Sequence, residues 1–139
     1  MISLDAPIIP GESAAGIRIG QPISELLSQH SPVAIEELAC ITRYEFGPVW
    51  VWANDNIIDQ IGVFQGYAGA LSERIKVGDK MLEVKNIIGE IFEDMEDSLC
   101  VLDSPGWCFE TSHWDNGDDP DKNLGASIVG IFVFAKPNK

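Results

Sequence analysis

Cys108, Glu110 and His113 are the residues of this chain whose types and spacing could support nucleophilic chemistry. A cysteine thiol can act as a nucleophile when a histidine base lies within hydrogen-bond reach. All three residues lie in the segment "GWCFETSHW" (106–114), whose apolar and aromatic residues predict a β-strand. Because side chains alternate along a strand, Cys108 and His113 would point to opposite faces. We therefore expect Cys108 to be packed, His113 to be exposed and the pair to be inactive.

His30 is the only other histidine, and it follows a short helical pattern, so we expect it at a helix end. The sequence offers no set of nucleophile, base and orienting group, and we predict that the protein is not an enzyme. The segment "GESAAG" (11–16) lacks the GK[ST] ending of a phosphate-binding loop, and we expect no cofactor. Cys40, Cys100 and Cys108 form no closely spaced metal-type pair and have apolar neighbours, so we expect three buried thiols.

The segment "DNGDDPDKN" (115–123) carries acids at Asp115, Asp119 and Asp121, which could suit a calcium ion. It lacks the spaced glycine and the final glutamate of an EF-hand loop, and Pro120 interrupts it. We expect no specific metal site here but a loop that faces solvent or a partner. Whether that loop binds a cation stays open.

The charge balance is the strongest global feature, with 22 acidic residues against nine basic residues and a net charge of -13. Nucleic acid is excluded as an expected ligand, because phosphate binding requires Lys and Arg to displace counterions. An anionic membrane surface is disfavoured for the same reason. Two explanations for the acidity remain, namely solubility and recognition of a basic protein partner.

The length of 139 residues and the apolar content of 45% suit one domain with a proper core, so we assign residues 1–139 to a single domain. No stretch reaches the ~18 to 20 apolar residues of a membrane span. No Lys or Arg precedes Arg18, so the N-terminus lacks the basic start of a signal peptide. We predict a cytoplasmic protein.

The elements that would position these residues show an internal repeat. "IRIG" (17–20) returns as "IKVG" (75–78) at an offset of 58, and a short apolar helical pattern follows each. "EELACI" (36–41) resembles "EDSLCV" (96–101), "WAN" (52–54) resembles "WDN" (114–116), and "IIDQIGVF" (57–64) matches "SIVGIFVF" (127–134) at an offset of 70 for its apolar positions. We therefore expect a duplicated unit.

Each unit, at about 16–66 and 74–135, is expected to run as a strand, a short helix and then antiparallel strands. This predicts an α+β fold, with the "NDN" segment (54–56) as a turn. Trp50 and Trp52 should share one face of their strand, by period two. The apolar matches predict six equivalent interior residues, which are Ile58, Ile61, Phe64, Ile128, Ile131 and Phe134.

The second unit has extra residues between "WDN" and its final strand, and these residues are acidic. Surface insertions of this kind often carry function, and tryptophan is a preferred anchor at protein interfaces. A second acidic cluster, "EDMED" (93–97), precedes the strand "SLCVL". The predicted partner-binding residues are Trp114, Asp115, Asp118, Asp119 and Asp121, and Glu93, Asp94, Glu96 and Asp97 in the second cluster.

The segments "GIRIG", "VWVWANDNIIDQIGVFQGYAGAL", "IKVG", "GWCFE" and "IVGIFVF" resemble those of small bacterial immunity proteins encoded beside polymorphic toxins, as in contact-dependent growth inhibition. The resemblance covers most of the chain, from Gly16 to Phe134. It implies a protein that binds and neutralises the C-terminal domain of a cognate toxin, often a basic nuclease. The build is also similar in outline to that of the β-lactamase inhibitor protein. A second hypothesis is a regulatory domain that binds a small molecule in a pocket between the two repeats.

Overall fold

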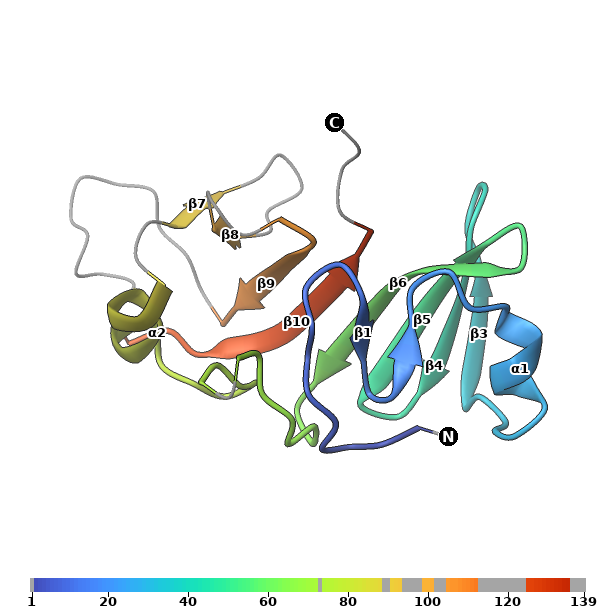
Figure 1. The fold of residues 1–139 in the computed structure, drawn as a ribbon, viewed down its shortest axis with the longest axis horizontal. Helices are drawn as coiled ribbons and strands as arrows, with labels where there is room; N and C mark the ends of the chain where they lie inside the picture. Colours follow the sequence, from blue (N-terminus) through green and yellow to red (C-terminus); the bar gives the residue numbers. More distant parts are fainter. Residues whose placement is uncertain are drawn as a thin grey trace.

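The computed structural model describes residues 2–72, 74–88, 91–93, 99–101, 105–112 and 125–135. Its main element is an eight-stranded antiparallel sheet in the order β3-β4-β5-β6-β10-β9-β8-β7 (Figure 1). The first half contains β3 (Ala34–Glu37), β4 (Thr42–Phe46), β5 (Val49–Asn54) and β6 (Ile57–Phe64). The second half contains β7 (Ile91–Glu93), β8 (Leu99–Val101), β9 (Trp107–Thr111) and β10 (Ile128–Phe134). Antiparallel pairing of β6 with β10 joins the two halves at the centre of the sheet.

The expected α+β fold class is wrong, because strands dominate the described chain. The only helices in the described segments are α1 (Ile23–Leu27) and α2 (Met81–Ile88), and neither is long and apolar enough to cross a membrane. The strand expected before each helix is also missing from the main sheet. β2 (Ile17–Arg18) pairs only with β1 (Ser13–Ala14), and Ile75 makes an isolated bridge with Leu71. The described part of the chain therefore forms one long sheet, a small two-stranded sheet and two short helices, rather than two strand–helix–antiparallel-strand units.

The helices begin at points that backbone hydrogen bonds tie to the two central strands. Gly20 donates its N–H to the carbonyl of Ile58 at 2.7 Å, and Gly78 donates to the carbonyl of Ile128 at 2.8 Å. The two donors, Gly20 and Gly78, are 58 residues apart and the two acceptors, Ile58 and Ile128, are 70 residues apart, the same offsets as the sequence matches. Each helix is thus attached beside one of the strands that pair at the centre of the sheet.

Turn chemistry separates the strands of the first half. Asp55 and Asn56 have positive φ angles of 52° and 65°, which form the tight turn predicted between β5 and β6. Two-residue hairpins favour this conformation because its twist matches that of the strands. Gly47, with a φ of 76°, divides the alternating run "YEFGPVWVW" into β4 and β5.

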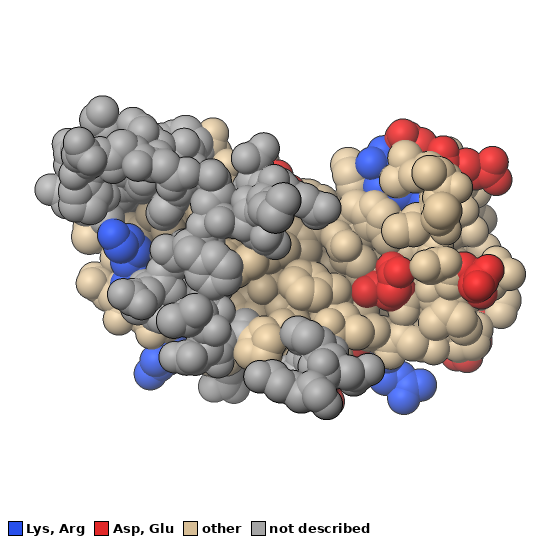
Figure 2. All heavy atoms as spheres, turned by 90° about the horizontal axis from the view of Figure 1, so that it is seen from above, with Lys and Arg blue, Asp and Glu red and all other residues tan. Residues whose placement is uncertain are grey.

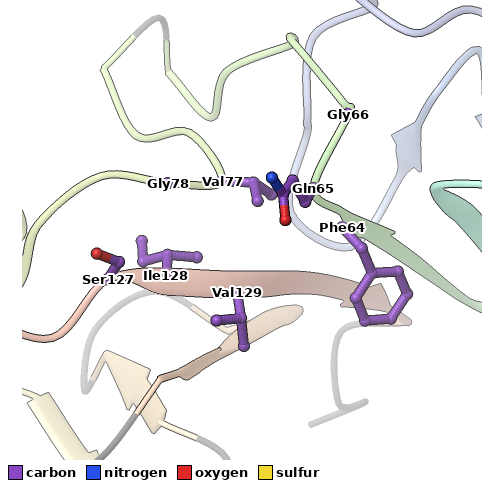
Figure 3. Close-up of a pocket in the computed structure, with 8 residues that line it drawn as sticks. All are labelled: Phe64, Gln65, Gly66, Val77, Gly78, Ser127, Ile128 and Val129. Atoms are coloured by element: carbon purple, nitrogen blue, oxygen red, sulfur yellow. The ribbon is translucent and has the colours of Figure 1, made fainter.

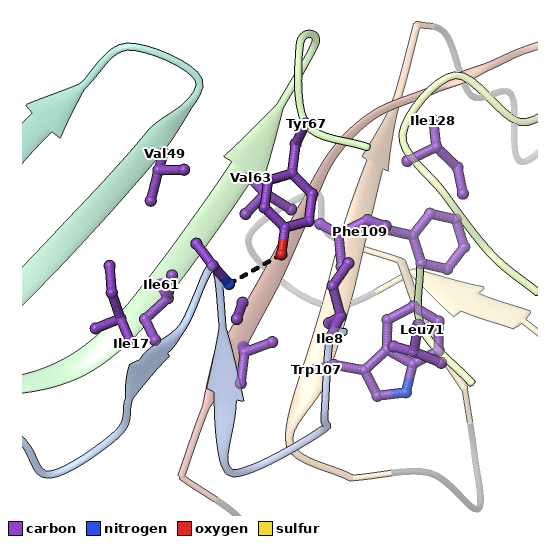
Figure 4. Packing of buried hydrophobic residues seen from close by; sticks show 14 of the residues in the cluster. Ile8, Ile17, Val49, Ile61, Val63, Tyr67, Leu71, Trp107, Phe109 and Ile128 are labelled. Carbon is purple, nitrogen blue, oxygen red and sulfur yellow. Dashed lines mark hydrogen bonds between the residues drawn. The ribbon is translucent and has the colours of Figure 1, made fainter. Parts of the chain in front are cut away.

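The core lies on one face of the sheet, where the N-terminal segment and the loop after β6 cover it (Figure 4). Tyr67, in the loop after β6, connects this loop to the N-terminal segment. Its hydroxyl donates to the carbonyl of Ala6 and accepts the N–H of Ala15 at 2.9 Å. Fully buried side chains from both halves of the sheet pack together here, including Val49, Ile61, Val63, Leu99, Trp107, Phe109, Ile131 and Val133.

Two β-bulges decide which side chains reach this core. Asp59 has no opposite residue on β5, and Val129 has none on β9. An extra residue in one strand shifts the alternation of the side chains that follow it. Four of the predicted interior residues, Ile58, Ile61, Ile128 and Ile131, are buried as expected. Phe64 and Phe134 are only half-buried, and the prediction that they are interior is wrong.

Candidate functional site

Four aromatic rings form a continuous layer on the sheet face opposite the core. Trp50 and Trp52 come from β5, Phe64 from β6 and Phe132 from β10. The ring centroids of Trp50 and Phe64 lie 4.7 Å apart, those of Trp50 and Trp52 lie 6.1 Å apart, and those of Phe64 and Phe132 lie 5.6 Å apart. Trp52 closes the group with an edge contact to Phe132 at 6.1 Å. These four residues are called the aromatic cluster below.

The strand register explains how the aromatic cluster assembles. Trp50 on β5 and Phe132 on β10 both pair with Gly62 on the intervening strand β6. Phe64 pairs in the same way with Gly130. Because both glycines lack a side chain, the rings lie directly over the sheet backbone and meet one another. Phe132 is buried at 6% exposure, whereas the two tryptophans and Phe64 are each half-buried.

Arg43 on β4 connects the aromatic cluster to acidic side chains. Its guanidinium carbon lies 4.7 Å from the ring centroid of Trp50, within the range of a cation–π contact. Its Nη2 lies 2.6 Å from Glu36 and 3.0 Å from Glu45. The Nε atom of Arg43 is buried and has no hydrogen-bond partner among the described residues. One arginine thus faces two carboxylates, and the group next to Trp50 retains net negative charge.

The acidic character extends over the neighbouring surface. Figure 2 shows one face of the molecule, and most acidic atoms of described residues on this face lie toward the end where Figure 1 draws β3, β4 and α1. The edge strand β3 adds Glu36 and Glu37, and every residue of this strand is exposed. The aromatic cluster therefore borders the acidic residues Glu36, Glu37 and Glu45 of β3 and β4, which are called the acidic strip below. Aromatic rings beside negative charge suit a basic partner.

A pocket of about 380 Å³ lies at the seam between the halves of the sheet (Figure 3). Phe64 and Gln65 line it from the first half, and Val77, Ser127 and Val129 line it from the second. None of its lining residues carries an ionisable side chain. The pocket can hold an apolar group, but its lining cannot supply an acid or a base.

Most of the predicted partner-binding residues fall outside the described chain. This applies to Trp114, Asp115, Asp118, Asp119 and Asp121, and to Asp94, Glu96 and Asp97. Of Glu93 only the backbone is described, as the last residue of β7. The assignment of both acidic clusters to a contact surface therefore remains a prediction.

The structure places the other candidate residues as follows. Cys108 is buried as predicted, but Cys100 is half-buried, and Cys40 is exposed because it lies in the turn between β3 and β4. His30 follows α1, where its Nε2 accepts the N–H of Ile2 at 3.1 Å, so its role is structural. His113 lies outside the described residues, and its relation to Cys108 is untested.

Two groups in the described chain have shifted pKa values, and both belong to the scaffold. Burial raises the pKa of Asp59, the bulged residue of β6, and a hydrogen bond from its own backbone N–H partly opposes that shift. Burial also raises the pKa of Tyr67. Across the segments that the structure describes, no group of three His, Cys, Asp or Glu residues could hold a metal ion.

The chain matches no family model and no curated protein sequence. Among solved structures it is similar to the uncharacterized protein yfeY from Escherichia coli, with a TM-score of 0.69. The two share 10% sequence identity, and the likeness covers 93% of this chain and 99% of the other. At this identity the likeness shows a shared fold alone.

Proposed function

We propose that this protein is a non-enzymatic binding protein whose aromatic cluster is the contact surface for a basic protein partner. One observation carries the proposal, which is the half-exposed layer formed by Trp50, Trp52 and Phe64 over glycine-bearing strands. Binding energy at protein interfaces concentrates in a few aromatic and arginine residues near the centre of the contact.

Charge indicates which class of partner this surface would take. The chain carries a net charge of -13, and Glu36 and Glu45 lie next to the aromatic cluster through Arg43. Complementary charge steers association and excludes partners of like sign. The expected partner is therefore a protein with an excess of Lys and Arg on its contact surface.

The specific form of this proposal is a cytoplasmic immunity protein that neutralises a toxin domain. Nuclease toxins carry basic surfaces to hold phosphates, and an acidic inhibitor can cover such a surface. The sequence resemblance to immunity proteins supports this form. The acidic loop around Trp114 would then extend the contact surface.

The test uses the C-terminal domain of the large secreted protein that the immunity hypothesis places immediately upstream of this chain's gene. Purified toxin domain should bind the parent protein, and association should slow as salt is added. Trp50→Ala should weaken binding, whereas the matched control Leu82→Ala, which trims an exposed apolar residue on α2, should not. The absence of such a neighbouring gene would contradict the toxin form of the proposal.

The seam pocket supports a second candidate function, which is binding of a small apolar molecule. Its volume of about 380 Å³ lies within the range of ligand sites, and Ile128 and Val129 provide apolar contacts. Replacing Val77 by Trp should fill the pocket while every residue of the aromatic cluster is kept, Phe64 being the one member that also lines the pocket. A metabolite that raises the melting temperature of the parent but not of Val77→Trp would favour this function over protein binding.

A further inference from the structure

The strand β3 is an open edge of the main sheet. It pairs with β4 on one side, and no described strand pairs with its other side (Figure 1). At the hairpin end, Leu38 donates its N–H to the carbonyl of Ile41 at 2.8 Å, so these two residues form a hydrogen-bonded pair. Hydrogen-bonded and non-hydrogen-bonded pairs alternate in antiparallel strands. The backbone N–H and C=O groups of Ile35 and Glu37 therefore face away from β4.

The edge presents exposed apolar side chains and two adjacent acidic side chains. Val33 is 78% exposed, Ile35 is 58% exposed and Leu38 is 42% exposed. Glu36 and Glu37 lie between them, and the Glu36 side chain is 54% exposed although it pairs with Arg43. Exposed apolar side chains beside outward-facing backbone groups are the features that an added strand recognises.

The open edge could pair with a second copy of this chain or with a strand of another protein, and charge distinguishes between these two. A second copy of this chain would bring its own Glu36 and Glu37 against the same residues, and each copy carries a net charge of -13. Such pairing is repelled, which is how acidic residues protect an open edge from self-association. A strand with Lys or Arg at alternate positions meets no such repulsion and can place its apolar residues over Val33 and Ile35.

We infer that β3 binds an extended basic segment of a partner protein as an additional antiparallel strand. This goes beyond the proposed function, because the edge lies two strands away from the tryptophans of the aromatic cluster on β5. The edge supplies the main-chain hydrogen bonds, Val33 and Ile35 supply apolar contact, and Glu36 and Glu37 select for positive charge. Ile35 and Glu37 can therefore be changed without removing the Glu36–Arg43 ion pair beside Trp50.

The test measures binding of a fluorescent seven-residue peptide of alternating lysine and valine by anisotropy. A control peptide has the same sequence with alternate backbone amides N-methylated, which keeps the charge but prevents strand pairing. We expect the unmodified peptide to bind at least about tenfold more tightly, since the N-methylated peptide loses several main-chain hydrogen bonds to β3. Equal binding of the two peptides would overturn the inference, because it would show charge attraction alone.

Two variants locate the binding to the edge. Ile35→Pro removes an outward-facing N–H together with the Ile35 side chain, and Pro is tolerated on edge strands because that N–H makes no bond within the sheet. It should abolish the preference for the unmodified peptide, whereas Ile35→Thr, which keeps the N–H, should retain it. If Ile35→Pro fails to fold by circular dichroism, Glu37→Pro removes a second outward N–H and serves the same purpose. An unchanged preference in a folded proline variant would contradict the inference.

A further control tests whether the segment that binds β3 must be basic. A peptide with glutamate in place of lysine should bind no better than the N-methylated peptide, and equal binding would overturn the assignment to a basic segment. Sedimentation of the protein alone should show a monomer. A dimer that Ile35→Pro converts to monomer would instead identify a second copy as the occupant of β3.

Discussion

Gly62 on β6 lies directly beneath the ring of Phe132 on β10. The two residues pair across the central strands, and a Cβ atom at position 62 would stand 3.0 Å from Cδ1 and Cε1 of Phe132. The same atom would lie 3.1 Å from Cζ3 of Trp52. The missing side chain therefore lets rings from two strands meet over a third, and the aromatic cluster depends on it.

Gly62→Ala should destabilise the protein because the added methyl group pushes Phe132 and Trp52 out of contact. Overpacking of this kind costs about 1 to 3 kcal/mol of unfolding free energy. Urea denaturation measures the loss, and Gly125→Ala is the control, since a Cβ there meets nothing within 4 Å. Equal stability of the two variants would show that the aromatic cluster is loosely packed.

Local patterns predicted the strands and turns of the sheet better than its side-chain directions. The alternation in β5 correctly placed Trp50 and Trp52 on one face, and the acidic and amide residues after them marked the turn to β6. The bulge at Asp59 could not be read from alternation, because it depends on pairing with β5. Phe64 was expected in the core because it matches Phe134 in the repeat, and such a match does not show which face of the sheet a side chain occupies.

The fold class was mistaken for a related reason. Short apolar patterns such as Ile23 to Leu27 indicate a helix locally, but they do not show how much of the chain is strand. The edge strand β3 has exposed residues throughout, so no burial pattern marked it as a strand. Phe132 belongs to an apolar run with buried residues on both sides, which concealed its opposite direction.

Tyr67→Phe should cost about 1 to 3 kcal/mol of unfolding free energy, because it leaves a buried carbonyl and a buried N–H without their partner. The hydroxyl of Tyr67 receives the N–H of Ala15 and donates to the carbonyl of Ala6. The matched control is Tyr44→Phe, since Tyr44 has no hydrogen bond from its hydroxyl to a described residue and is half-buried. Guanidinium denaturation of both variants gives the comparison. A loss no larger than that of the control would mean that this bond does not hold the N-terminal segment.

Asp59→Asn should change how stability depends on pH. Burial raises the pKa of Asp59, so the folded state holds this proton more tightly than the unfolded state. Its contribution is complete below the ordinary carboxyl pKa of about 3.9 and is lost as pH rises through the raised folded value. The parent should therefore lose stability relative to Asp59→Asn as the pH rises above the ordinary carboxyl pKa of about 3.9. A difference that stays constant across this range would contradict the assignment.

The aspartates of the acidic loop are predicted to act on association through their charge. Changing Asp118, Asp119 and Asp121 to Asn should slow association with a basic partner and flatten its salt dependence, because exposed charges act over about 8 Å at physiological ionic strength. The dissociation rate should change little. Stopped-flow association at two salt concentrations tests this. Unchanged association rates would contradict a role for these aspartates. Electrostatic attraction of the partner would then be assigned to the acidic strip on β3 and β4.

The dissociation rate of the partner from Trp52→Ala is the most direct test of the aromatic cluster as the contact surface. A tryptophan at the centre of an interface contributes about 2 kcal/mol or more, which corresponds to roughly 30-fold faster dissociation. Surface plasmon resonance with the identified basic partner gives this rate, after thermal unfolding has shown that Trp52→Ala remains folded. We predict acceleration of about that size for Trp52→Ala and none for Leu82→Ala. Equal dissociation rates for the parent, Trp52→Ala and Leu82→Ala would contradict the account.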